Sequence, residues 1–91
     1  MPQALFPLGN MFITPGALAA CHACAVTPAI ILGRHVAGDW QDISCEDQAA
    51  NRRAIDEGER VFSAYQIGAQ RLFVVTEADR SLTTLLLADE Y

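Results

Sequence analysis

The chain has 91 residues, a formal net charge of −5, no lysine and 52% hydrophobic residues. This length allows one small domain, and a chain without a basic patch is not expected to bind a phosphate backbone directly. No apolar run is long enough to cross a membrane, and the N-terminus lacks the charged start and long apolar segment of a signal peptide, so we expect a cytoplasmic protein with no membrane contact.

The first part of the chain predicts an arm followed by a folded domain. Residues 1–10 are interrupted by prolines and a glycine, and we expect them to form a flexible N-terminal arm. Residues 11–91 are expected to form a single domain. Within it, residues 11–13 are apolar and form a possible short edge strand.

Helix start signals then occur three times. Twice a threonine that can cap a helix precedes a proline that fits the first helical position, which predicts helices over residues 15–25 and 28–37. Gly38 ends the second of these in a left-handed conformation. A third, mostly polar helix begins after the capping residue Ser44 and ends at Gly58.

The second half of the chain predicts a sheet. Residues 61–67, 71–76 and 82–87 are rich in β-branched, aromatic and leucine side chains and are separated by short turns. The fold class is therefore α+β, with three short N-terminal helices packed on a C-terminal three-stranded antiparallel sheet. Helices that cover one face only would leave the other face for a second copy, so we expect a monomer or a homodimer.

The cysteines suggest a metal or redox site that their spacing does not support. Cys21 and Cys24 form a CxxC pair, and His35 and Cys45 complete a possible set of four zinc ligands. Nine residues separate His35 from Cys45, which is wider than usual for a ligand pair. The CxxC pair also lies in the second half of a predicted helix, where the helix dipole does not stabilise a thiolate. We expect free thiols, no metal ligands and no cofactor.

Two polar stretches are the candidate sites. The segment after the second helix combines a histidine, an aspartate and the only tryptophan, and the turn between the last two strands carries two carboxylates and an arginine. Both stretches also have a structural interpretation, as a helix end and as a self-bonded turn. No nucleophile accompanies the histidine and aspartate of the first stretch, and the carboxylates of the second would need a cleft to act in catalysis. We therefore assign no catalytic residue and predict partner binding by His35, Asp39, Trp40, Glu77, Asp79 and Arg80.

Several short motifs in this order resemble one small, uncharacterised bacterial family. They are Thr14-Pro15-Gly16-Ala17-Leu18, Arg34-His35, Gly38-Asp39-Trp40, Ser63-Ala64-Tyr65, the stretch from Thr76 to Ser81, Thr83-Thr84 and Glu90-Tyr91. Members of that family occur on plasmids, integrative elements and chromosomes, and they are labelled plasmid-related proteins or subunit M of a type I restriction endonuclease. The resemblance implies an association with mobile elements. A methyltransferase subunit needs a large α/β domain with a Gly-rich turn, which this chain lacks.

Three functions remain open at this point. The first is a non-enzymatic interaction module, an accessory protein of mobile genetic elements with an unidentified protein partner. The second is a small metal- or thiol-dependent enzyme that uses His35, Asp39 and the cysteines. The third is an acidic decoy that mimics DNA, because residues 39–59 carry seven acidic residues and only two arginines.

Overall fold

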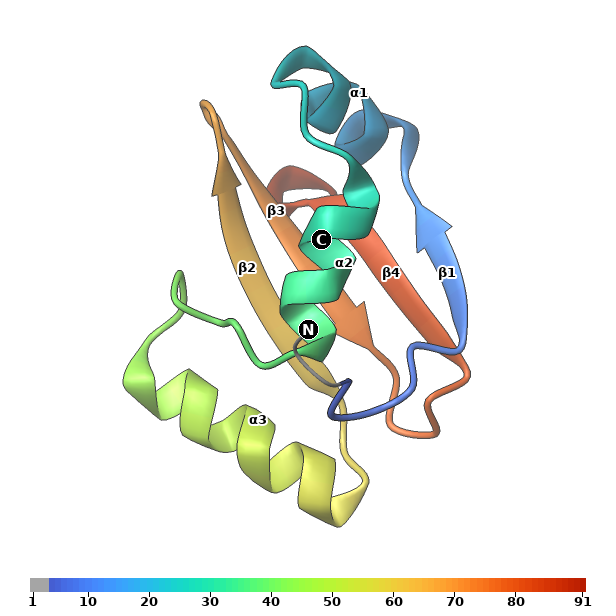
Figure 1. Cartoon of the computed structure of the whole chain (residues 1–91), viewed down its shortest axis with the longest axis vertical. Coiled ribbons are helices and arrows are strands. Elements are labelled where there is room, and N and C mark those ends of the chain that lie inside the picture. The colour runs from blue at the N-terminus through green and yellow to red at the C-terminus, as the bar shows by residue number, and fades with distance from the viewer. Residues whose placement is uncertain (1–3) are drawn as a thin grey trace.

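Four strands form a single mixed sheet in the computed structural model, which describes residues 4–91 (Figure 1). The order of strands across the sheet is β1-β4-β3-β2. The α+β class and the three N-terminal helices are confirmed. The elements are β1 (Asn10–Ile13), α1 (Pro15–Ala23), α2 (Pro28–Val36), α3 (Cys45–Glu57), β2 (Val61–Ile67), β3 (Gln70–Thr76), β4 (Leu82–Leu87) and the short 3-10 helix η1 (Ala88–Glu90).

The sheet differs from the three-stranded antiparallel sheet that the sequence predicted. The possible edge strand at residues 11–13 exists, begins at Asn10, and pairs with β4 in parallel, with Met11 opposite Thr83. Because three helices separate β1 from the hairpins, the chain can return to the sheet in the same direction, which a tight hairpin does not allow. The pairs β2–β3 and β3–β4 are antiparallel hairpins, as predicted.

Two of the three predicted capping residues make side-chain hydrogen bonds to the helix they precede, whereas Thr27, before α2, makes none. The Thr14 side chain accepts a hydrogen bond from the Ala17 backbone N–H at 3.1 Å, and Ser44 accepts one from Asp47 at the same distance. Gly58 ends α3 with a φ of 72°, a left-handed conformation that glycine adopts without steric cost. The first helix is shorter than predicted because Ala25, expected at its end, has a φ of 55°.

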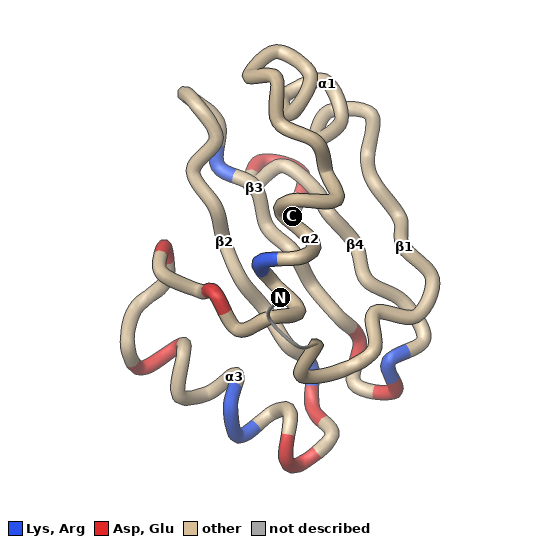
Figure 2. Tube along the Cα trace, in the orientation of Figure 1, with Lys and Arg blue, Asp and Glu red and all other residues tan. Residues whose placement is uncertain are grey.

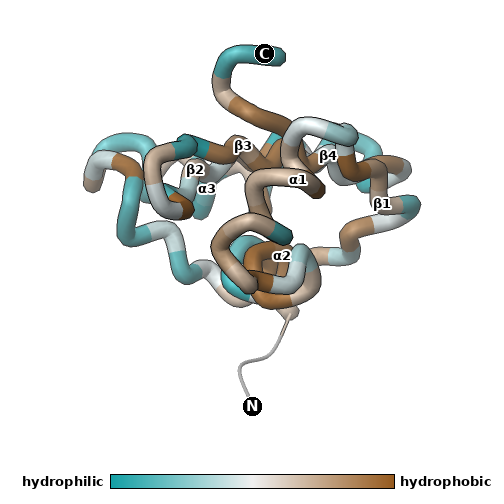
Figure 3. The backbone as a smooth tube through the Cα atoms, turned by 90° about the horizontal axis from the view of Figure 1, so that it is seen from above, coloured by the Kyte–Doolittle hydropathy of each residue, from teal (hydrophilic) through white to brown (hydrophobic). Residues whose placement is uncertain are grey.

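The helices are distributed unevenly around the sheet. In Figure 3, α2 and the N-terminal segment lie on one face of the sheet, and the C-terminal end of the chain lies on the opposite face. The face toward α2 carries the main core, which includes Ile31 and Leu32 of α2 with Tyr65, Leu72 and Leu85 of the strands. The opposite face carries an aromatic cluster of Phe62, Phe73 and Tyr91, with ring centroids 4.8 to 6.0 Å apart.

Side chains block one edge of the sheet. The buried Asn51 of α3 donates to the Phe62 carbonyl at 2.6 Å and accepts from the Phe62 N–H at 3.1 Å. Asp42 accepts from the Gln66 N–H at 3.0 Å. These contacts satisfy three backbone groups of β2 that a neighbouring strand would otherwise bind, so they hinder pairing at this edge.

The N-terminal segment packs on the domain where the structure describes it. The Leu5 N–H donates to the Val36 carbonyl at 2.8 Å, and the Phe6 side chain is buried in a second apolar cluster with Trp40. The flexible arm predicted for residues 1–10 therefore has a docked part. Residues 1–3 lie outside the described residues.

Replacement of Asn51 by leucine tests the role of this side chain at the β2 edge. Asn51→Leu removes both partners of the Phe62 backbone while keeping the side-chain bulk, so we expect the free energy of unfolding to fall by about 1–3 kcal/mol. Urea denaturation measures the change. The exposed neighbour in Arg52→Ala is the matched control and should change stability by less than about 0.5 kcal/mol. Equal effects of the two substitutions would contradict this role.

Candidate functional site

His35 is the centre of a buried polar cluster. Its side chain is 0% exposed, and it lies in the last turn of α2 above the sheet. The imidazole Nδ1 is hydrogen-bonded to the Ser63 hydroxyl, and Nε2 lies 2.9 Å from the Thr76 hydroxyl. The Phe6 ring meets the imidazole edge-on, with centroids 5.3 Å apart. One side chain thus connects α2 with β2, β3 and the N-terminal segment.

The hydrogen bonds form a chain with a fixed direction. Thr83 donates to the Leu8 carbonyl at 2.7 Å, and because a hydroxyl has a single proton, Thr76 must be the donor to Thr83 at 2.8 Å. The Thr76 oxygen is then the acceptor for the Nε2–H of His35. Nδ1 carries no proton and accepts from Ser63. The geometry therefore selects the neutral Nε2–H tautomer of His35.

Burial reinforces this neutral state. It lowers the pKa of His35 to about 4, because the charged imidazolium is poorly solvated inside the domain. Both ring nitrogens already have partners, and neither reaches the surface. His35 therefore serves as a structural group, and neither the partner contact nor the proton transfer considered for it has access to solvent in this conformation.

Trp40 and Tyr65 hold the segment after α2. The Trp40 side chain is 1% exposed, and its indole N–H donates to the His35 carbonyl at 2.9 Å. The Tyr65 hydroxyl donates to the Asp39 carbonyl, also at 2.9 Å, and burial raises the pKa of Tyr65 to about 12. Trp40 was predicted to bind a partner, but its side chain is part of the core.

Asp39 remains at the surface. Its Oδ2 accepts from Arg34 Nε at 2.8 Å, and the Arg34 guanidinium lies 4.6 Å from the centroid of the Tyr65 ring. The other carboxylate oxygen, Oδ1, is shielded from water and has no hydrogen-bond partner among residues 4–91. Asp39 and Arg34 are thus a surface pair fixed from below by an aromatic ring.

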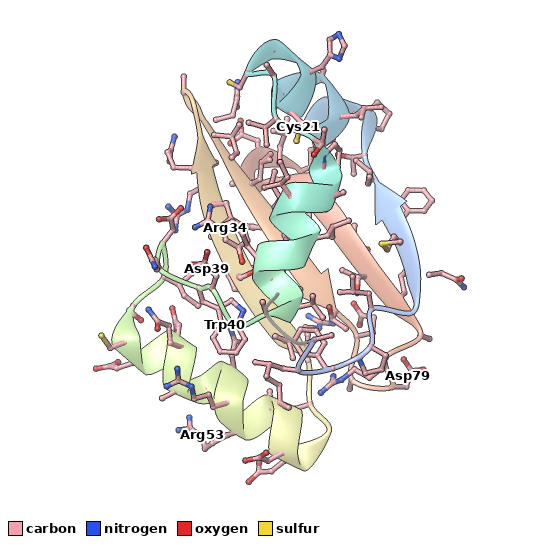
Figure 4. The ribbon with its side chains drawn as sticks, viewed as in Figure 1. Cys21, Arg34, Asp39, Trp40, Arg53 and Asp79 are labelled. Carbon is pink, nitrogen blue, oxygen red and sulfur yellow. The ribbon has the colours of Figure 1, made fainter. Side chains whose placement is uncertain are left out.

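The turn after β3 is held largely by its own hydrogen bonds. Asp79 accepts from both the backbone N–H and the hydroxyl of Ser81, and these bonds lower the pKa of Asp79. Arg80 has a φ of 60° and donates to the carbonyls of Ala54 and Glu59, so it joins this turn to the end of α3. Glu77 pairs with Arg60 at 3.2 Å. Figure 4 shows Asp39 and Asp79 on opposite sides of α2, so the two predicted stretches do not form one site.

The structure does not bring the possible zinc ligands together. Cys21 is buried in α1, and burial raises its pKa. Cys24, just after α1, and Cys45, at the start of α3, are both exposed. In the described part of the chain, no three His, Cys, Asp or Glu side chains are close enough to hold a metal ion. A raised thiol pKa is the opposite of what a nucleophilic cysteine needs.

Apolar surface is the feature that the sequence reasoning missed. Within residues 4–91, six large apolar side chains are exposed, namely Leu5, Met11, Phe12, Leu18, Ile30 and Tyr91. Five of the six precede Arg34, which is the first charged residue of the chain. Figure 2 shows the consequence, because β1 and α1 carry no charge while α3 and the turns carry charges of both signs. The absence of Asp, Glu, Lys and Arg before position 34 was the signal that could have revealed this surface.

Two shallow hollows flank α2. One, of about 600 Å³, is lined by Ala29, Ile30, Gly33 and Ala37, with Arg34 and Asp39 among its other lining residues. The other, of about 390 Å³, lies between α2 and β1 and is lined by Met11, Ile13 and Leu32 among others. We call the first one the α2 hollow. It brings Asp39, one of the predicted partner-binding residues, next to the exposed Ile30.

Comparisons with protein-family models, with curated proteins and with solved structures found no match to this chain. In the described residues no single helix is long and apolar enough to span a membrane, and α1 and α2 meet that criterion only as a pair bent by 105°. The resemblance to the plasmid-related family rests on the short motifs and stays a prediction.

Because His35 is buried and neutral, we expect the protein to become less stable as the pH is lowered. Its pKa is about 4 in the folded protein and about 6.5 in the unfolded chain, so the unfolded state binds more protons between these values. The contribution of neutral His35 to the free energy of unfolding is fully present above about pH 6.5 and is lost as the pH falls toward 4. We expect urea denaturation to show a loss of about 2 kcal/mol between pH 8 and pH 5, where most carboxylates stay ionised.

The exposed His22 provides the control for this pH dependence. Its side chain lies at the surface of α1, so His22→Gln should leave the dependence unchanged. A stability that stays constant between pH 8 and pH 5, or a slope that disappears in His22→Gln, would contradict the buried neutral state of His35.

Proposed function

We propose that this chain is a non-enzymatic protein-interaction module that acts in the cytoplasm and binds its partner through the α2 hollow. The observation that carries the proposal is the contrast between interior and surface. The imidazole and the hydroxyls that could perform chemistry bind one another inside the domain, whereas the Ile30 side chain is 58% exposed. Exposed apolar patches of this kind mark contact sites for other proteins.

The shape of the α2 hollow supports a partner that inserts an apolar side chain. Ala29, Gly33 and Ala37 line it with little bulk, and a Cβ atom added at Gly33 would meet no atom within 4 Å. A partner can therefore approach α2 closely between Ile30 and the Arg34–Asp39 pair. That pair has its geometry fixed by Tyr65, so it offers a preorganised polar rim next to an apolar floor.

The resemblance adds the biological setting of the proposal. A small acidic binding protein linked to mobile genetic elements would act as an accessory factor whose partner is a protein of the element or of its host. The turn with Asp79 lies away from the α2 hollow (Figure 4) and contributes to the fold in this proposal.

Affinity capture tests this function. The chain, tagged at its C-terminus to leave the α2 hollow open, is used to capture proteins from a lysate of the bacterium that carries it. We expect a discrete partner whose recovery falls by about tenfold or more in Ile30→Glu, because a charge would be buried against an apolar surface. Arg53→Glu on the exposed face of α3 is the matched control and should retain the partner.

Two results would contradict the proposal. One is that the wild-type chain captures nothing beyond the empty resin. The other is that Ile30→Glu and wild-type protein recover the same proteins in equal amounts. Circular dichroism of both variants confirms that folding is retained, because Ile30 and Arg53 are both exposed.

A further inference from the structure

The two edges of the sheet differ in how their backbone hydrogen-bonding groups are covered. Asn51 and Asp42 bind three backbone groups of β2, which hinders pairing at that edge. The other edge is β1, which lies at the opposite end of the strand order. Natural proteins usually protect such edges with short strands, charged residues, proline or bulges. The strand Asn10–Ile13 is short, with four residues, but it carries no charge, proline or bulge, and it exposes Met11 and Phe12.

The backbone of β1 presents a regular pattern to this open edge. Asn10 N–H donates to the Ser81 carbonyl at 3.0 Å, and Thr14 N–H donates to the Leu85 carbonyl at 3.1 Å. In a parallel ladder, alternate residues bond to the neighbouring strand, so the N–H and C=O groups of Met11 and Ile13 point outward. The open edge therefore offers two donors and two acceptors in strand geometry.

We propose that a second copy of this chain pairs with the β1 edge, antiparallel and around a two-fold axis at Phe12, to form a homodimer with one continuous sheet. In this arrangement Met11 faces Ile13 of the second copy, and Ile13 faces its Met11. Each of these facing pairs exchanges two hydrogen bonds, about four in total. The pattern is complementary to itself, as a two-fold interface requires.

Phe12 occupies the centre of this pairing. Phe12 pairs with Thr84 of β4, and the same row of paired residues continues through Val75 to Phe62. Side chains of paired residues point to the same face of a sheet, so the Phe12 ring lies with Phe62 on the face opposite α2. The Phe12 side chain is 62% exposed in the single chain. In the dimer it would lie directly opposite Phe12 of the second copy in a non-hydrogen-bonded position, where side chains are closest and aromatic pairs stabilise a sheet.

The charge distribution favours a second copy as the occupant. Each copy carries a net charge of −5, and every charged residue lies at position 34 or later. Pairing through β1 brings together two uncharged strands, each with the Asp79–Arg80 turn near its Asn10 end and Glu90 hydrogen-bonded to Thr14 at its other end. The charged helix α3 lies beside β2, at the far side of the sheet (Figure 1), so the two copies of α3 are as far apart as the sheet allows.

The hollow between α2 and β1 adds apolar area to the contact. Met11 and Ile13 line it together with Leu32 and Gly33 of α2, and the two-fold axis places the hollows of the two copies next to each other. A stable dimer buries about 800 Å² on each copy, which a strand of four residues does not supply alone. The proposal therefore depends on both the strand and the hollow. This hollow and the α2 hollow share Ala29 and Gly33, but Met11 lines only the first and Ile30 lines only the α2 hollow.

Sedimentation equilibrium tests the dimer with three proteins. We expect a reversible dimer for the wild-type chain, the same dimer for Ile30→Glu, and a dissociation constant raised by about tenfold or more for Phe12→Glu. The two variants add the same charge at similarly exposed positions, so they separate the strand edge from general surface effects. Ile30→Glu also separates the two proposals, because it should lose the protein partner and keep the dimer.

A charge-reversal experiment tests whether the two-fold axis of the dimer passes at Phe12. Phe12→Glu and Phe12→Lys should each dimerise at least about tenfold more weakly than wild type, because identical charges face each other across the axis. Mixed together, the two variants should form a heterodimer, since the carboxylate then faces the ammonium group. A purely structural effect of the substitutions would not be reversed by mixing.

Three results would overturn the proposal. The wild-type chain could be monomeric up to millimolar concentration, Phe12→Glu could dimerise as well as wild type, or the mixture of charged variants could stay monomeric. Vesicles of phosphatidylcholine provide one more outcome. If monomeric wild-type chain bound them and Phe12→Glu did not, the uncharged edge would belong to a lipid surface and the dimer would be excluded.

Discussion

The hydrogen-bond chain from Ser63 through His35, Thr76 and Thr83 to the Leu8 carbonyl is the constraint on which the rest of the structure depends. Its members come from one helix, three strands and the N-terminal segment. Each polar group is buried or partly buried, so the loss of one member leaves the next without a partner in a region of low dielectric. The chain therefore fixes how α2 sits on the sheet and how the segment before β1 is tied to β4.

Because of this hydrogen-bond chain, the side chains of His35, Ser63 and Thr76 bind one another in the interior and are not exposed at the surface. His35 and Trp40 resemble site residues in the sequence, yet they hold the core, and Asp79 and Arg80 mainly hold a turn against α3. By contrast, the apolar side chains of Phe12 and Ile30 are exposed to solvent. This distribution is the basis on which we propose contacts with other macromolecules at the exposed apolar side chains.

Local signals predicted the local structure well. The capping residues Thr14 and Ser44 and the terminating Gly58 act as expected, and β2 spans the predicted residues 61–67 because its aromatic and β-branched side chains favour a strand. The parallel pairing of β1 with β4 was not predictable in this way, because it depends on contacts across the whole chain. The partners of His35 are similarly remote, with Ser63 and Thr76 lying 28 and 41 residues away. A clue was present nonetheless, because Ser63 lies in the same alternating row as Val61 and Tyr65 and so faces the core.

The central claim is that His35 is a neutral, fully bonded group in the interior, and the nitrogen NMR spectrum of its imidazole tests that claim most directly. The claim predicts the Nε2–H tautomer, with a protonated Nε2 and an unprotonated Nδ1, and chemical shifts that stay constant from pH 8 down to about pH 5. A His35 signal that titrates near the ordinary value of about 6.5, or one that shows the proton on Nδ1, would contradict the account.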